Sequence, residues 1–213
     1  MSGIFGFSFR RDPAAELQLT LEGLRYWNQL YGSAAADSTL IGPSGIGCHV
    51  EHFSDQFPYT GPIHQDQGTY AVVDALLYNR EELLSLLQLP SSALISDEAL
   101  LLQLIRQKGF SSLSRVNGDF AGAIYDVEKC TVTLFRDHMG VRPLFYYANE
   151  KQLAFSTDIR GLISMEIVDV AVDEEWLYNE VAGMARMGTE NTEFAHIHCV
   201  KPASYMTFSL KNA

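Results

Sequence analysis

The chain has 213 residues, of which 47% are hydrophobic and 19% charged, and its formal net charge at pH 7 is −11. This composition argues against a disordered chain, and no run of roughly 18 apolar residues suggests a membrane span. The acidic balance, with no cluster of Lys and Arg, argues against nucleic acid or an anionic membrane surface as the partner. A chain of this length buries a sizeable core, as one large domain or two small ones.

The three cysteines, Cys48, Cys130 and Cys199, are odd in number and widely spaced, without a CxxC pair. They are typical of reduced and mostly buried thiols. Because the N-terminal residues lack a basic segment followed by an apolar one, no signal peptide is expected, and the cytoplasm is the predicted compartment.

The first elements are predicted from residue periodicity. Residues 3–9 alternate three phenylalanines onto one face, which predicts a strand with close backbone neighbours at its glycines. Leucines at helical spacing predict a helix over 14–30. Residues 32–68, rich in Gly, Ser, Pro and Asp, indicate short strands and loops.

A strand followed by a sharp corner and a helix is predicted next. Residues 69–77 are rich in strand-forming residues, and Asn79 with Glu82 forms a capping-box pattern for a helix that ends before Pro90. A second helix, expected to lie beside the first, is predicted over 97–108.

The last third predicts strands and one more helix. A meander of strands is expected at 120–126, 131–136, 144–148 and 152–156, followed by a helix over 174–184 and a strand pair within 195–209. Without a repeat or flexible linker, the pattern indicates one α+β domain whose helices pack outside antiparallel sheets.

Chemical motifs are scarce. His196 and His198 lack a third ligand at metal-binding spacing, and no glycine-rich loop or P-loop lysine supports nucleotide binding. The segment 136–143 concentrates polar residues at a strand end, where Arg136 and Asp137 are interpreted as a network that holds a turn.

Five blocks, in one order, resemble the glutamine amidotransferase domain of asparagine synthetases. They are MSGIFG at 1–6, YNREEL at 78–83, VNGDFA at 116–121, RDHMGVRPLF at 136–145 and LAFS at 153–156. The resemblance, which extends to β-lactam synthetases and lasso-peptide cyclases, implies a class II amidotransferase with the N-terminal-nucleophile hydrolase fold. That fold is a four-layer αββα sandwich of two antiparallel sheets between helices. It implies that 1–213 form a single glutaminase-type domain, with the family's C-terminal synthetase domain absent from this chain.

The family's catalytic position carries a different residue here. In the family the residue after the initiator Met is a cysteine whose thiol attacks glutamine, with the free α-amino group as base. This chain has Ser2 at that position. Serine is a poorer nucleophile than cysteine near neutral pH, yet it serves at the N-termini of related hydrolases. Ser2 alone therefore does not decide whether the domain is active or inactive.

Other carried-over positions also depart from the family. An Asn-Gly-Glu run supplies the oxyanion-hole donor and a contact to the substrate amine, and this chain has Asp74, Ala75 and Leu76 there. The arginine that clamps the glutamine carboxylate aligns with His52, which cannot make a two-pronged contact. Asp97 keeps its family identity and is expected to hold a substrate amine.

These departures predict a degenerate domain. The leading hypothesis is a glutaminase-type domain without glutaminase activity that acts as a structural or docking partner for an ATP-dependent amide-forming domain, fused or separate. ATP and Mg²⁺ are expected only in that synthetase domain, and no cofactor is expected in this one. The alternative is an active N-terminal-serine amidohydrolase that acts on glutamine or another small amide. A module that binds a free amino acid through Asp97 and a homodimer both stay open.

Overall fold

The computed structural model describes residues 3–9, 36–49, 63–66, 68–165, 167–184 and 190–211. The predicted helix over 14–30 and the candidate site residues Ser2 and His52 lie outside these described residues.

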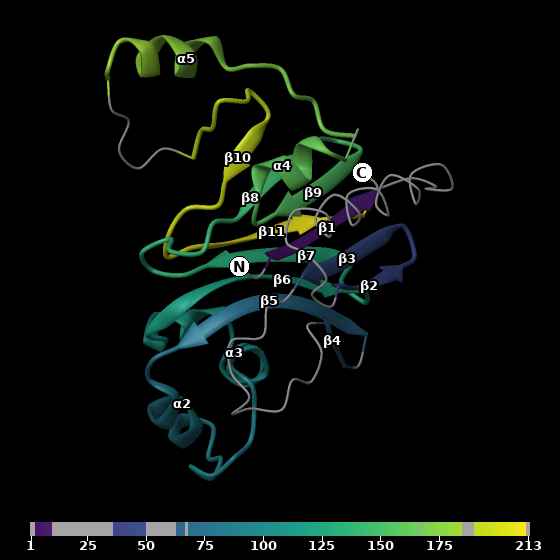
Figure 1. The fold of residues 1–213 in the computed structure, drawn as a ribbon. Helices are drawn as coiled ribbons and strands as arrows, with labels where there is room; N and C mark the ends of the chain where they lie inside the picture. The colour runs from purple at the N-terminus through teal and green to yellow at the C-terminus, as the bar shows by residue number, and fades with distance from the viewer. Residues whose placement is uncertain are drawn as a thin grey trace.

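Two antiparallel sheets make up the body of the domain (Figure 1). The first has six strands in the order β10-β8-β9-β1-β3-β2, and the second has five in the order β11-β7-β6-β5-β4. The strands are β1 (Gly3–Phe9), β2 (Ala36–Ile41), β3 (Ser44–His49), β4 (Ile63–Asp66), β5 (Thr69–Leu77), β6 (Gly118–Asp126), β7 (Thr131–Arg136), β8 (Phe145–Ala148), β9 (Gln152–Ser156), β10 (Ile197–Cys199) and β11 (Tyr205–Ser209).

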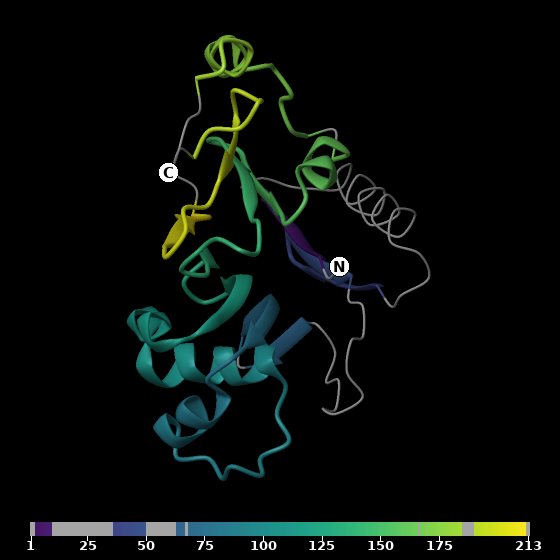
Figure 2. The ribbon, with the colours of Figure 1, turned by 60° about the vertical axis from the view of Figure 1, so that its left-hand side comes forward.

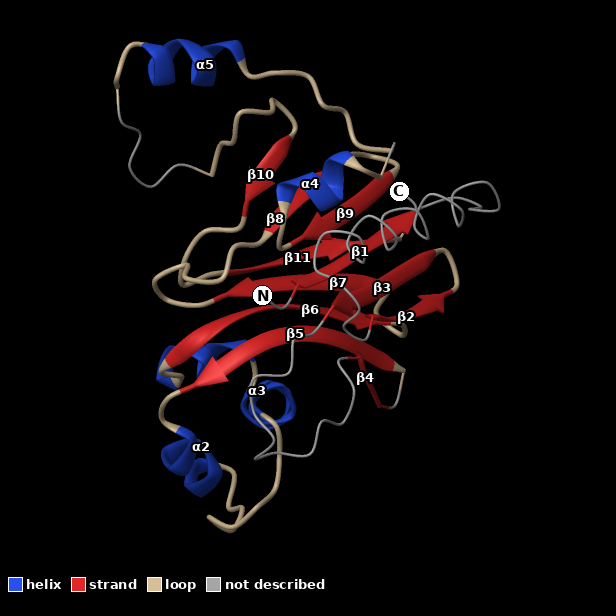
Figure 3. Cartoon of the chain, in the orientation of Figure 1, coloured by secondary structure: helices blue, strands red, loops and turns tan. Residues whose placement is uncertain are grey.

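Helices cover the outer faces of both sheets (Figure 3). Those described are α2 (Arg80–Leu86), α3 (Asp97–Lys108), the 3₁₀ helix η1 (Phe110–Arg115), α4 (Ile159–Ile163) and α5 (Glu174–Val181). The two helices α2 and α3 pack on the five-stranded sheet, as neighbours, and α4 packs on the six-stranded sheet. The predicted αββα sandwich is therefore confirmed.

The core follows the alternation of side chains along each strand. Ile4 of β1 and Val72 of β5 belong to one buried cluster between the sheets. The intervening residues face outward: Phe5, Phe7 and Phe9 pack with α4, as their spacing predicts, and Val73 packs with α2 and α3.

The predicted meander and the predicted final strand pair are wrong about which strands share a sheet. The hairpin of β6 and β7 belongs to one sheet, whereas that of β8 and β9 belongs to the other. In the same way β10 pairs with β8 and β11 with β7, so the last two strands never pair with each other. Residues 137–144 carry the chain between the sheets, a change of layer that strand periodicity does not encode.

The expected capping box is also wrong in its hydrogen bonds. The Asn79 side chain makes no cap bond to α2; its Nδ2 donates to Glu82 Oε2 at 2.9 Å and to the Arg115 carbonyl at 3.0 Å. Its Oδ1 accepts from the Asn117 amide at 2.9 Å. Asn79 therefore ties the corner after β5 to the segment that leads into β6. In contrast, α3 has its Ser96 cap, and α5 ends at Val181 rather than at residue 184.

Candidate functional site

The C-terminal end of β5 brings together the sequence-predicted residues that the structure describes. Asp74 and Leu76 share the face of β5 that points toward the six-stranded sheet, whereas Ala75 points toward the helices. Asp74 is buried and Leu76 is exposed. Strand β1, which begins at Gly3, packs against β5.

Asp74 forms an ion pair that the sequence does not predict. Arg142 Nη1 lies 3.4 Å from Asp74 Oδ2. Burial raises the pKa of Asp74 to about 6. The positive charge of Arg142 acts to lower this pKa, and the nearby Glu98 carboxylate acts to raise it. The position expected from the resemblance to hold an amide donor therefore holds a carboxyl group that is mostly ionised at neutral pH.

Arg142 ends the segment 137–142, and the Asp137 side chain fixes the backbone conformation of that segment. The Asp137 side chain is 1% exposed and accepts four backbone N–H bonds, from Phe120 at 3.3 Å and from Met139, Val141 and Arg142 at 3.0 Å each. Arg136 donates to the carbonyls of Gly140, Arg142 and Val200. The predicted network at this turn is thus confirmed, and it also fixes the partner of Asp74.

Asp97 already has two protein partners. Its Oδ2 accepts from the Leu77 amide at 2.7 Å, and its Oδ1 pairs with the Arg80 guanidinium. The Arg80 Nη2 also donates to the Ile95 carbonyl at 2.7 Å, which holds the guanidinium in place. The carboxylate expected to hold a substrate amine therefore fastens the start of α3 to the end of β5.

Apolar side chains surround this end of the site. Leu76, Tyr78 and Val141 are exposed, and Met139 is 82% exposed. Tyr78 is held in place, since its hydroxyl donates to Asp119 Oδ2 at 2.6 Å. Exposed apolar residues that cluster around a site are typical of a surface that contacts another molecule.

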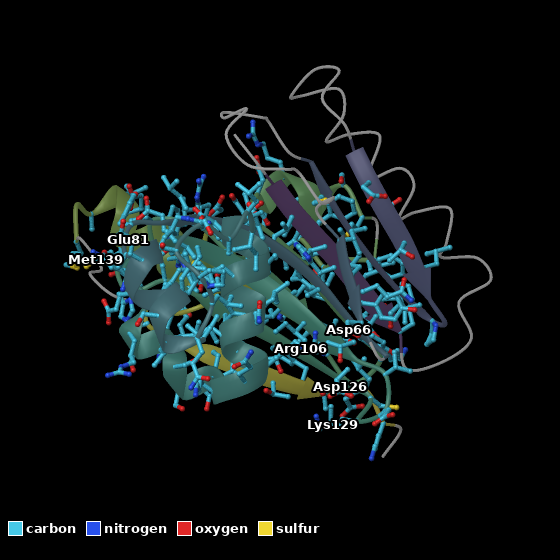
Figure 4. All side chains as sticks on the ribbon, turned by 90° about the horizontal axis from the view of Figure 1, so that it is seen from below. Asp66, Glu81, Arg106, Asp126, Lys129 and Met139 are labelled. Atoms are coloured by element: carbon cyan, nitrogen blue, oxygen red, sulfur yellow. The ribbon has the colours of Figure 1, made fainter. Side chains whose placement is uncertain are left out.

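The opposite end of the sheet carries a polar hollow. Figure 4 shows Met139 and Glu81 at the left of the view, and Asp66, Arg106 and Lys129 well away from them, below and to the right. A cavity of about 880 Å³ opens there between α3, β4 and the turn after β6. Two of its rim cations are paired with rim carboxylates, Arg106 with Asp66 and Lys129 with Asp126.

The remaining sequence candidates are the histidines and the cysteines. Among the described residues no group of three His, Cys, Asp or Glu side chains is placed to hold a metal ion. Cys48 is buried, as expected, and burial raises the pKa of its thiol, but Cys130 and Cys199 are only partly buried. Within the same described residues, no helix is long and apolar enough to span a membrane.

Residues 57–213 match the glutamine amidotransferase domain family. The chain belongs to this family. The amidotransferase domain is of the class II type that asparagine synthetases carry, as the five sequence blocks imply. The family match begins after the positions of Ser2 and His52 and includes Asp74, Ala75, Leu76 and Asp97.

The amidotransferase domain is similar in sequence to two curated asparagine synthetases and in fold to a solved amidotransferase structure. It is 31% identical over 177 residues to asparagine synthetase B of Escherichia coli K12, covering 76% of this chain and 30% of that protein. It is 27% identical over 154 residues to asparagine synthetase 2 of Bacillus subtilis 168, covering 70% and 20%. The glutamine PRPP amidotransferase structure from B. subtilis aligns with a TM-score of 0.59 at 15% identity, over 99% of this chain and 50% of that one, which shows the fold alone. The chain spans less than a third of either synthetase.

Proposed function

We propose that this amidotransferase domain has lost glutaminase activity and serves as a structural and docking partner for an ATP-dependent amide-forming polypeptide, fused or separate. The observation that carries the proposal is the buried Asp74 carboxylate, ion-paired with Arg142 where the family's oxyanion donor is expected. A carboxylate repels the negative charge that develops on the substrate oxygen, and loss of one donor costs about 3 kcal/mol of transition-state stabilisation. The binding of ATP and Mg²⁺ is assigned to the partner.

Two further features support the proposal. Leu76 replaces a residue expected to contact the substrate amine, and the second amine contact, Asp97, is already bonded to Arg80 and Leu77. The exposed apolar residues around the site supply a contact surface of the kind a docking partner needs.

The Ser2→Cys variant is expected to release no glutamine-dependent ammonia above background. A restored thiol supplies the nucleophile, but the donor, the amine contact and the carboxylate clamp stay absent. The assay measures ammonia from glutamine with protein whose N-terminal processing is verified by mass, so that the thiol is known to be at the first residue. Appreciable ammonia release by this single variant would contradict the proposal.

An active N-terminal-serine amidohydrolase is the second candidate, and one observation favours it. Arg142 Nε is buried and has no hydrogen-bond partner within the described part of the chain, so it is a donor that an oxyanion can use. Incubation of the Met-free protein with glutamine and a panel of small amides separates the candidates. Turnover that Ser2→Ala abolishes would establish the hydrolase and overturn the docking proposal.

Glutamine is expected not to bind to the domain at millimolar concentration. Asp97 would have to exchange its bonds to Arg80 and the Leu77 amide for a bond to the ligand amine, with no net gain in charged hydrogen bonds. Isothermal titration calorimetry checks this, and heat from a saturable millimolar or tighter site would instead support the amino-acid-binding module.

A further inference from the structure

An arm stands away from the sandwich and carries α5 at its tip. Figures 1 and 2 show α5 beyond α4 from two directions, separated from both sheets. The base of the arm is fixed by a short antiparallel pairing: Ala195 N–H donates to the Ala171 carbonyl at 2.8 Å and Asp173 N–H to the Glu193 carbonyl at 2.9 Å. The arm is defined here as residues 167–196, of which 167–184 and 190–196 are described.

The tip of this arm presents an apolar face without any buried residue. No side chain of α5 is buried. Leu177, Tyr178 and Val181 are 48%, 69% and 81% exposed, and Met184 beyond the helix end is exposed as well. Within α5, the spacing of three and four residues puts Leu177, Tyr178 and Val181 on one side of the helix.

The helix is too short to be stable by its own hydrogen bonds. It has eight residues, well below the about 12 to 15 that an isolated helix needs in water. Its N-terminus is well specified, because Asp173 Oδ1 accepts from the Trp176 amide at 2.8 Å and Glu174 and Glu175 occupy the first turn. A defined helix start without a packed face is typical of a segment that packs on a partner.

Charge decides what kind of partner fits the arm. The arm contains seven acidic residues and one arginine, so it holds a net charge of −6 of the chain's −11. The residues 167–184 that lead into and form α5 contain no Lys or Arg. A second copy of this acidic chain is repelled by the arm, whereas a groove with an apolar floor and a rim of Lys and Arg complements it.

We propose that the arm inserts the apolar face of α5 into a groove with a basic rim on the amide-forming polypeptide. The inference rests on the proposed function and names the element that makes the contact. Leu177, Tyr178 and Val181 provide the apolar anchors, and the acidic residues of the arm provide the attraction that orients the helix.

A photoreactive amino acid at position 177 tests the contact in cells of the source organism. Crosslinking is expected to one polypeptide that, once purified, catalyses ATP-pyrophosphate exchange, the signature of an adenylating enzyme. The matched control is the same amino acid at position 94, because Leu94 is 73% exposed on the helix side of the other sheet. No crosslink is expected from that position.

The double substitution Leu177→Ser with Val181→Ser then measures the energetics. Affinity for the captured polypeptide should fall at least about tenfold, as loss of two interface anchors requires. The melting temperature should stay unchanged, because neither side chain is buried. Glu180→Lys should weaken binding further at low salt, and raised salt should weaken binding of the unchanged chain.

The outcomes separate the inference from the proposed function. Crosslinking of position 177 to a second copy of this chain overturns the docking of α5 on the amide-forming polypeptide. Crosslinking of that polypeptide only from position 139, beside the candidate site, overturns the inference and leaves the proposed function standing. The absence of any such partner at positions 177 and 139 overturns both.

Discussion

Asp137→Ala is expected to lower the free energy of unfolding by at least about 4 kcal/mol, since hydrogen bonds to a charged group contribute about 1.5 to 3 kcal/mol each. The four backbone amides that donate to this buried carboxylate lose their acceptor together. Three of them lie where the chain passes from one sheet to the other, and the fourth, that of Phe120, lies in β6. For a chain of this size the loss corresponds to a fall of about 10 °C in melting temperature, which calorimetry or urea titration measures.

Two further variants make this prediction specific. Asp137→Asn keeps the shape but turns one of the two acceptor oxygens into a donor, so it should cost about half as much. Asp119→Ala removes a carboxylate that accepts an exposed hydrogen bond from the Tyr78 hydroxyl. This substitution should change the free energy of unfolding by less than about 1 kcal/mol. Equal losses in Asp137→Ala and Asp119→Ala would refute the assigned role of the Asp137 network.

Local sequence signals predict most elements correctly because each has a local cause. The three phenylalanines of β1 alternate onto one face, and Ser96 caps α3 in the structure as in the pattern. The errors arise where a distant partner decides. Asn79 has the sequence of a cap, but its side chain bonds Asn117 and Arg115 instead, because β6 begins beside the corner.

The candidate site is predictable to the same extent. The sequence places Asp74, Ala75 and Leu76 at the end of β5, since a strand-to-helix corner follows them. It does not reveal Arg142 as the partner of Asp74, because the two residues belong to segments joined only by tertiary packing. The one available signal is the concentration of polar residues in 136–143, which points to a turn network but not to its contact across the sheet.

Asp74→Asn is expected to stabilise the protein progressively as the pH rises from 4 to 7. Burial raises the pKa of Asp74 to about 6 in the folded state, against 3.8 as its ordinary value. Between these pH values the folded protein retains a proton that the unfolded chain has released, so the stability contributed by this group is full below about pH 4. That stability is lost as the pH rises through about 6, and the loss amounts to about 3 kcal/mol at pH 7.

The asparagine variant lacks this titration, so its stability relative to the unchanged chain should rise by about 3 kcal/mol between pH 4 and pH 7. Urea titrations of both proteins across this range measure the difference. Asp126→Asn is the matched control with the opposite sign, since the hydrogen bond from Lys129 lowers the pKa of Asp126. A difference between Asp74→Asn and the unchanged chain that stays flat with pH would show that Asp74 titrates as it does in the unfolded chain and that burial does not raise its pKa. A difference that is still rising above pH 7 would instead show that Asp74 stays protonated at neutral pH, and the repulsion argument against an oxyanion at this position would lose its basis, because that argument requires the charged carboxylate.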